Sequence, residues 1–178
     1  EKTCVANGWK VIQLRHGVFR EELFARPGGA ALRKVFEGKL TDYEFQMLLL
    51  AKDAGAMRRF AIERAPDCEK LVRGLSDADV VRAFSDLGGH CMEKLVEAFA
   101  TARRDASAPY MILAHTLKGW GLECAAHPAN HSTLPEEAEI HALLARHGLS
   151  VEDPFAHFLD GSPEADYLAR RRDQFRRG

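Results

Sequence analysis

The 178-residue chain has the length of one domain with a small extension, and its 46% hydrophobic and 29% charged residues are ordinary for a globular protein. Its 25 basic and 26 acidic residues leave a formal net charge of -1, which excludes a global field that would attract nucleic acid or a membrane surface. The longest apolar run is far shorter than the roughly 20 residues of a bilayer span, and four scattered cysteines favour reduced thiols, so we expect a cytoplasmic protein.

The first predicted element is a short strand at residues 8–14 (GWKVIQL), which has the β-branched and aromatic residues typical of strands. Two short helical pieces follow, and Pro27-Gly28-Gly29 separates them. The longest helical pattern then begins at a cap formed by Thr41 or Asp42 and has a weak point at Gly55. The sequence therefore predicts a helix-rich region directly after the first strand.

The next two helices are predicted from a cap and from a periodic apolar stripe. Ser76, followed three residues later by Asp79, is typical of a capping box, and Gly88-Gly89 is expected to stop that helix. The second helix carries apolar residues at helical spacing on one face, which predicts that this face is core. They are Met92, Leu95, Val96, Phe99 and Ala100.

The second predicted strand, residues 108–116 (APYMILAHT), is apolar nearly throughout, as expected of a strand buried on both faces of a parallel sheet. Pro135-Glu136-Glu137 then opens a helix that runs to about His147 and is capped by Gly148. A last helix is capped by Ser162-Pro163-Glu164, and its basic end is expected to be a solvated face.

Two strands are too few for an independent sheet of normal size. We therefore predict an α/β fold, the helix-rich part of a larger parallel-sheet domain with about two strands in this chain. We expect residues 1–148 to form the domain, and residues 149–178 to form a linker with a terminal helix.

The loop between the second strand and the Pro135 helix allows three interpretations. Cys124, His127 and His131 have ligand types and spacings that zinc accepts, but they provide three ligands and no fourth partner is evident. In the second interpretation Lys118, flanked by glycines just past the carboxyl end of a strand, binds a phosphate. His131 would then act from a mobile lid. In the third interpretation Trp120 packs, and the lysine and the histidines are surface groups.

Five segments together resemble one family in their order and spacing: GWKVIQLRHG, LTDYEFQ, LSDADVVRAFSDLGGHC, PYMILAHTLKGWGL and GSPEADYLARRR. The family is the homodimeric type of pyruvate dehydrogenase first component, a thiamine-diphosphate-dependent oxidoreductase related to the transketolases. The resemblance covers nearly the whole chain. It implies the second half of the domain that holds the cofactor diphosphate and Mg²⁺, in an enzyme that decarboxylates pyruvate oxidatively.

The resemblance also assigns site residues. Lys118 matches the family lysine after the His-Thr pair, so it is expected to act in catalysis and in cofactor binding. His131 matches the catalytic histidine of the mobile active-site loop. His115 is expected on the cofactor-binding side, and His90 is expected to be a helix-terminus feature without a catalytic role. No residue is assigned to a metal.

The family's Gly-Asp-Gly anchor for Mg²⁺ and diphosphate is absent from this sequence, as is the domain with the glutamate that activates the cofactor. We therefore expect a fragment or split product that is inactive alone and binds no cofactor alone. Its expected partners are the remaining domains of the enzyme, a second subunit and the dihydrolipoyl acetyltransferase component. The alternatives are a fragment of a transketolase-like enzyme acting on sugar phosphates and a non-catalytic helical interaction module.

Overall fold

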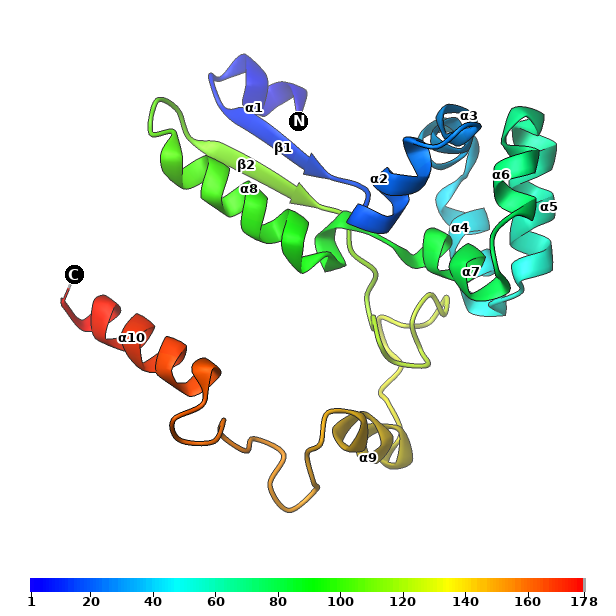
Figure 1. Cartoon of the computed structure of the whole chain (residues 1–178). Helices are drawn as coiled ribbons and strands as arrows, with labels where there is room; N and C mark the ends of the chain where they lie inside the picture. Colours follow the sequence, from blue (N-terminus) through cyan, green and yellow to red (C-terminus); the bar gives the residue numbers. More distant parts are fainter. Residues whose placement is uncertain (178) are drawn as a thin grey trace. The chain divides into compact units, whose positions relative to one another are not determined.

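The structure is a computed structural model that describes residues 1–177. It contains two compact units, Glu1–Leu134 and a second unit from Pro135 onward (Figure 1). The elements of the first unit are α1 (Lys2–Ala6), β1 (Lys10–Leu14), α2 (Val18–Phe24), α3 (Gly29–Lys34), the π-helical turn η1 (Val35–Lys39), α4 (Asp42–Ala51), α5 (Ala54–Arg64), the 3₁₀ turn η2 (Pro66–Cys68), α6 (Glu69–Arg73), α7 (Asp77–Ser85), the 3₁₀ turn η3 (Gly88–His90), α8 (Met92–Arg104) and β2 (Tyr110–Ala114). Those of the second unit are α9 (Glu137–Arg146) and α10 (Pro163–Arg177).

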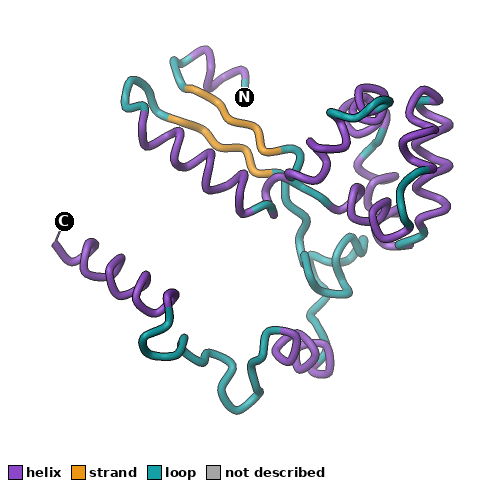
Figure 2. Tube along the Cα trace, in the orientation of Figure 1, coloured by secondary structure: helices purple, strands orange, loops and turns teal. Residues whose placement is uncertain are grey.

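Both predicted strands are present and form a two-stranded parallel sheet (Figure 2). They pair in register from Lys10 opposite Tyr110 to Leu14 opposite Ala114. Helix α8 runs along the sheet, and helices α2 to α7 gather beyond the carboxyl ends of the strands (Figure 1). The predicted fold class, helix-rich α/β with a parallel sheet, is confirmed.

The prediction that β2 is buried on both faces is wrong for this chain. Its residues are half-buried or exposed, and Leu113 keeps 38% of its surface accessible. The strand has one hydrogen-bonded neighbour among the described residues, so its apolar composition is not matched by burial. In β1 the buried residue is Leu14, at the carboxyl end.

Most of the core lies between the helices that follow β1 rather than on the sheet. One buried cluster joins α2, α3 and α6 around Leu23, and a second joins α4, α5 and α7 around Met57. Phe36 and Leu75 pack against both clusters. These helices therefore form one continuous packed layer, which fixes the position of the residues at the strand ends.

The helix breaks lie close to their predicted positions, with one correction. Thr41 caps α4 in a capping box with Glu44, and Gly28 (φ +83°) separates α2 from α3 as expected. The long pattern breaks not at Gly55 but at Lys52, which adopts φ +51°. Asp53 then caps α5 by accepting a hydrogen bond from the Ala56 backbone N–H at 3.0 Å.

Ser76 caps α7 by accepting the Asp79 backbone N–H at 3.1 Å, as predicted, but the expectation that Gly88-Gly89 stops this helix is wrong. The helix ends at Ser85. The two glycines instead allow a close approach to both strand ends. A Cβ on Gly88 would lie 2.5 Å from the Leu14 backbone, and a Cβ on Gly89 would lie 2.6 Å from the His115 carbonyl oxygen. Any larger residue would force these backbones apart.

The apolar stripe on α8 does not form core, which corrects the prediction. Met92, Val96 and Phe99 are 70%, 63% and 58% exposed, and the buried residue of the helix is Ala98. Helix α8 packs against β1, and among the described residues the sheet that it covers has two strands.

The second unit consists of α9, α10 and their connections. Glu136 is the N-cap of α9, so Pro135 precedes the cap instead of opening the helix as predicted. Gly148 follows the helix with φ +68°, and Ser162 caps α10 through the Ala165 N–H at 3.2 Å. The predicted boundary after residue 148 stays a prediction. Among residues 1–177, no helix is long and apolar enough to cross a membrane.

Candidate functional site

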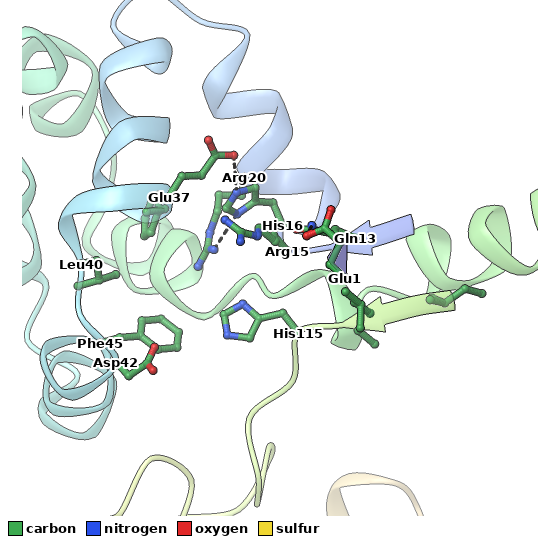
Figure 3. Close-up of a pocket in the computed structure, with 14 residues that line it drawn as sticks. Glu1, Gln13, Arg15, His16, Arg20, Glu37, Leu40, Asp42, Phe45 and His115 are labelled. Carbon is green, nitrogen blue, oxygen red and sulfur yellow. Dashed lines mark hydrogen bonds and ion pairs between the residues drawn. The ribbon is translucent and has the colours of Figure 1, made fainter. Parts of the chain in front are cut away.

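A cavity of about 570 Å³ lies at the carboxyl ends of β1 and β2 (Figure 3). Ligands of open parallel α/β sheets bind at this edge. Its polar lining includes Arg15, His16, Arg20, Glu37 and His115, and Asp42 lies beside Phe45 on another part of the wall. Cationic and anionic groups are therefore both present in one cavity.

The side chain of Arg20 is buried in the wall of this cavity, where it is 2% exposed. Its guanidinium donates to the carbonyl oxygens of Ala83 (2.7 Å) and Phe84 (2.8 Å) at the end of α7, and it lies 4.1 Å from the centroid of the Phe36 ring. No carboxylate forms an ion pair with it among the described residues. Burial accordingly lowers the pKa of Arg20 to about 10, although the negative charge of Asp86 acts to raise it.

Helix α2 positions Arg20 through its own N-terminus. The Asp86 carboxylate accepts the Arg20 backbone N–H at 2.8 Å, and the Gly17 N–H donates to the Asp86 carbonyl at 3.0 Å. A Cβ on Gly17 would lie 2.2 Å from the Asp86 carboxylate, so glycine leaves the space that this contact needs. The carboxylate also complements the positive end of the helix.

His16 lies between Arg20 and Glu37, as the dashed lines of Figure 3 show. Its Nδ1 is 3.0 Å from Arg20 Nη1, and its Nε2 is 3.2 Å from Glu37 Oε1. A guanidinium can only donate, so Nδ1 accepts and Nε2 carries the proton that it donates to Glu37. Burial, and then the charge of Arg20, lowers the pKa of His16 to about 4, although Glu37 acts in the opposite direction. The imidazole is therefore neutral at pH 7.

His115, predicted as a cofactor-binding residue, follows β2 and lines the same cavity (Figure 3). Its ring centroid is 6.0 Å from that of Phe45, and its backbone N–H donates to the Leu14 carbonyl at 3.0 Å. Partial burial, and then the charge of Arg20, lowers the pKa of His115. The cavity thus holds two imidazoles whose neutral forms are favoured.

The two residues predicted as catalytic, Lys118 and His131, are not among the residues that line this cavity. Both are exposed and lie in the loop between β2 and α9. The loop folds back on itself, because the Asn130 side chain donates to the Lys118 carbonyl at 3.2 Å and so brings the residue next to His131 close to Lys118. Gly119 (φ +74°) and Gly121 (φ +87°) supply the left-handed backbone that the turn after Lys118 requires.

The zinc interpretation gains no support from the loop geometry. Within residues 1–177, no three side chains of His, Cys, Asp or Glu are placed to hold a metal ion. The Nδ1 of His127 accepts the Ala129 N–H at 3.1 Å, and Cys124 lies against Gly119. These contacts hold the loop together and do not bring Cys124, His127 and His131 into a metal-binding arrangement.

Sequence reasoning missed the buried group at the end of β1. Neither the motifs nor the resemblance pointed to Arg20, His16 or Glu37, although the sequence holds a signal for two of them. His16 lies just before the N-cap Gly17 and Arg20 lies in the first turn of α2, so a histidine and an arginine four residues apart at such a helix start can come into contact. The partners from α7 and η1 could not be identified in this way, because they are distant in the sequence.

The fold and the cavity together define part of a parallel α/β domain with a polar cavity at the carboxyl edge of its sheet, the edge at which ligands of such sheets bind. No protein-family model matches the chain. Curated relatives do: the chain is 30% identical over 175 residues to the pyruvate dehydrogenase E1 component of Cupriavidus necator, covering 93% of this chain and 19% of that protein. It is 27% identical to the components of the same name from Corynebacterium glutamicum and Escherichia coli K12, again covering 19% of each.

The predicted resemblance to the pyruvate dehydrogenase first component is thus confirmed over nearly the whole chain. The chain spans about a fifth of the length of these relatives.

Proposed function

We propose that this chain contributes the second half of the diphosphate-binding domain of a thiamine-diphosphate-dependent pyruvate dehydrogenase first component. In this role it would take part in the oxidative decarboxylation of pyruvate. The observation that supports the proposal is the similarity over 93% of the chain to proteins of that name. The cavity at the carboxyl edge of the sheet supports the proposal further, because ligands of open parallel α/β sheets bind at this edge.

The described residues do not fit the Mg²⁺–diphosphate anchor. They hold no group of three metal-ligating side chains, and the sequence lacks the Gly-Asp-Gly motif expected for the anchor. The chain by itself is expected to bind neither thiamine diphosphate nor Mg²⁺ and to be inactive.

The chain does supply groups that can orient and stabilise a ligand. His115 offers the cavity an imidazole whose neutral form is favoured, and Arg20 adds a buried positive charge. Under this proposal, Lys118 supplies a mobile ammonium for an anionic phosphate or substrate carboxylate. His131 approaches from the loop, whose fold already ties its neighbour Asn130 to Lys118. A homodimeric, cytoplasmic enzyme with a dihydrolipoyl acetyltransferase partner is part of the same proposal.

A chimera tests the proposal. The 175-residue aligned segment of the Cupriavidus necator relative is replaced by this chain, and decarboxylation of pyruvate is measured with an artificial electron acceptor. We expect activity that depends on thiamine diphosphate, and Lys118→Gln should reduce it. Lys94→Gln, a change on α8, is the matched control and should not. A dimeric chimera that binds the cofactor but leaves pyruvate unchanged would contradict the proposal, and turnover of sugar phosphates instead would favour the transketolase-like alternative.

Native mass spectrometry of the chain alone tests the missing anchor. We expect the bare mass with and without thiamine diphosphate and Mg²⁺. Stoichiometric uptake of the cofactor would show that the anchor is not essential.

The exposed apolar face of α8 favours a second candidate, the non-catalytic interaction module. Met92, Val96 and Phe99 together present an apolar surface without a partner among the described residues. A module of this kind should be monodisperse at micromolar concentration, whereas a piece of a larger sheet should associate through its open strand edges. Analytical ultracentrifugation distinguishes the two.

A further inference from the structure

The turn Gly88–His90 holds the segment after β2 at three points. The Gly89 N–H donates to the His115 carbonyl at 2.9 Å. The Leu117 N–H donates to Nε2 of His90 at 2.8 Å. The His90 ring also stacks on Trp120, with the centroids 4.7 Å apart and the planes inclined by 13°. Lys118 lies between the last two contacts in the chain, so His90 contacts the residues on both sides of it.

The contact with Leu117 requires a neutral imidazole. A backbone N–H can donate only to an unprotonated ring nitrogen, so Nε2 of His90 accepts and Nδ1 carries the proton. Protonation of Nε2 would place two N–H groups against each other, and the backbone N–H of Leu117 would lose its acceptor. The hydrogen bond therefore exists in one protonation state of His90.

The surroundings of His90 favour the neutral state. Partial burial lowers its pKa, and the nearby His115, when charged, acts in the same direction. Three other titratable groups accompany His90. They are His115 at the end of β2, Cys91 next to His90 in the chain, and Lys118, which follows Leu117. No carboxylate forms an ion pair with His90 among the described residues.

We propose that His90 is a positioning residue for the loop that carries Lys118. Its neutral imidazole fixes Leu117 and Trp120 at the carboxyl edge of the sheet, and protonation of His90 releases them. The hold of His90 on the loop is a property of this chain by itself. A catalytic role of Lys118 in that loop rests on the proposed function. His90 thereby gains a role that the prediction of a helix-terminus feature did not include.

Trp120 provides the readout, because an imidazolium quenches the fluorescence of an indole stacked on it. The second tryptophan, Trp9, is replaced by Phe, and the emission of Trp120 is titrated from pH 8 to pH 4.5 in the full 178-residue chain. We expect the emission to fall with a midpoint below 6.5. His90→Gln should abolish this transition, because the glutamine amide can accept the Leu117 N–H but does not titrate. His127→Gln, a change of an exposed histidine in the same loop, should leave the transition in place.

Hydrogen exchange of the Leu117 amide gives a second, independent measurement. At pH 7.5, His90→Ala should raise its exchange rate by at least about tenfold, which corresponds to the loss of roughly one hydrogen bond. His90→Gln should restore most of the protection.

Two results would overturn the inference. One is a fluorescence transition that persists in His90→Gln, and the other is Leu117 exchange that is equal in wild type and His90→Ala. If the His90 variants do not fold, the wild-type protein still decides, since the Nδ1–H tautomer of His90 and a joint titration of its ring and the Leu117 amide are visible by NMR. None of these measurements uses cofactor or substrate. A failure of the proposed function is therefore distinguishable from a failure of this inference.

Discussion

Replacing Arg20 with methionine tests whether the buried guanidinium organises the site. The substitution keeps an unbranched side chain against Phe36 but removes three hydrogen bonds, those to the carbonyls of Ala83 and Phe84 and to the His16 ring. Each buried acceptor left without a donor costs about 1–3 kcal/mol. Removal of a buried, unpaired charge offsets several kcal/mol of this cost. We therefore expect a net loss of about 2–4 kcal/mol in the free energy of unfolding.

Urea denaturation followed by far-UV circular dichroism measures this loss. Arg15→Met is the matched control, because Arg15 lines the same cavity but is exposed. Its effect should stay within about 0.5 kcal/mol. NMR titration of His16 adds a second measurement: its pKa should rise in Arg20→Met, since the charge of Arg20 is the second cause, after burial, of the lowered value. Wild-type stability in Arg20→Met, or an unchanged pKa of His16, would refute this reasoning.

The pKa of His16 also predicts a pH dependence. Because it falls from 6.5 to about 4 on folding, the neutral ring stabilises the protein fully above pH 6.5, and this stability is lost as the pH falls toward 4, by about 1.4 kcal/mol per pH unit. In urea denaturation the wild type should lose more stability between pH 7 and 5 than His16→Gln, and equal losses would contradict the assignment. Gly89→Ala places a Cβ 2.6 Å from the His115 carbonyl oxygen and should lower the unfolding temperature by several degrees. Gly38→Ala is the control, because a Cβ there meets no atom within 4 Å, and it should leave the unfolding temperature unchanged. Similar unfolding temperatures for both variants would refute the close approach. Lys118→Gln should leave the stability of the chain within about 0.5 kcal/mol of wild type, because the side chain is exposed; a larger loss in urea denaturation would show an unrecognised structural role.

Local signals in the sequence predicted the elements well. The strand composition around Val11, the caps at Thr41 and Ser76 and the stop at Gly148 all depend on residues within a few positions of one another. The same local information placed His115 at a strand end, where the structure finds a cavity. The parallel pairing was predicted from the nearly continuous apolar composition of residues 108–116, and the register of the two strands confirms it.

The sequence could not show what each apolar or charged residue would contact. The stripe on α8 that includes Val96 has the periodicity of a buried face, yet burial depends on a neighbouring layer, and the two-stranded sheet does not provide one. For β2, too, an apolar composition specifies what the strand can bury, and the number of neighbours decides how much it does bury.

The sequence by itself thus determined the two strands, the caps of several helices, the resemblance to one family and the loop that carries Lys118. Only the tertiary structure decided that Gly88 and Gly89 approach the strand ends, that Arg20 is buried against α7 and that His90 holds the loop. The physical reason is the range of the interactions. Caps and periodicity act over about four residues, whereas these three contacts join segments that are distant in the chain and meet only when the helices pack beyond the sheet.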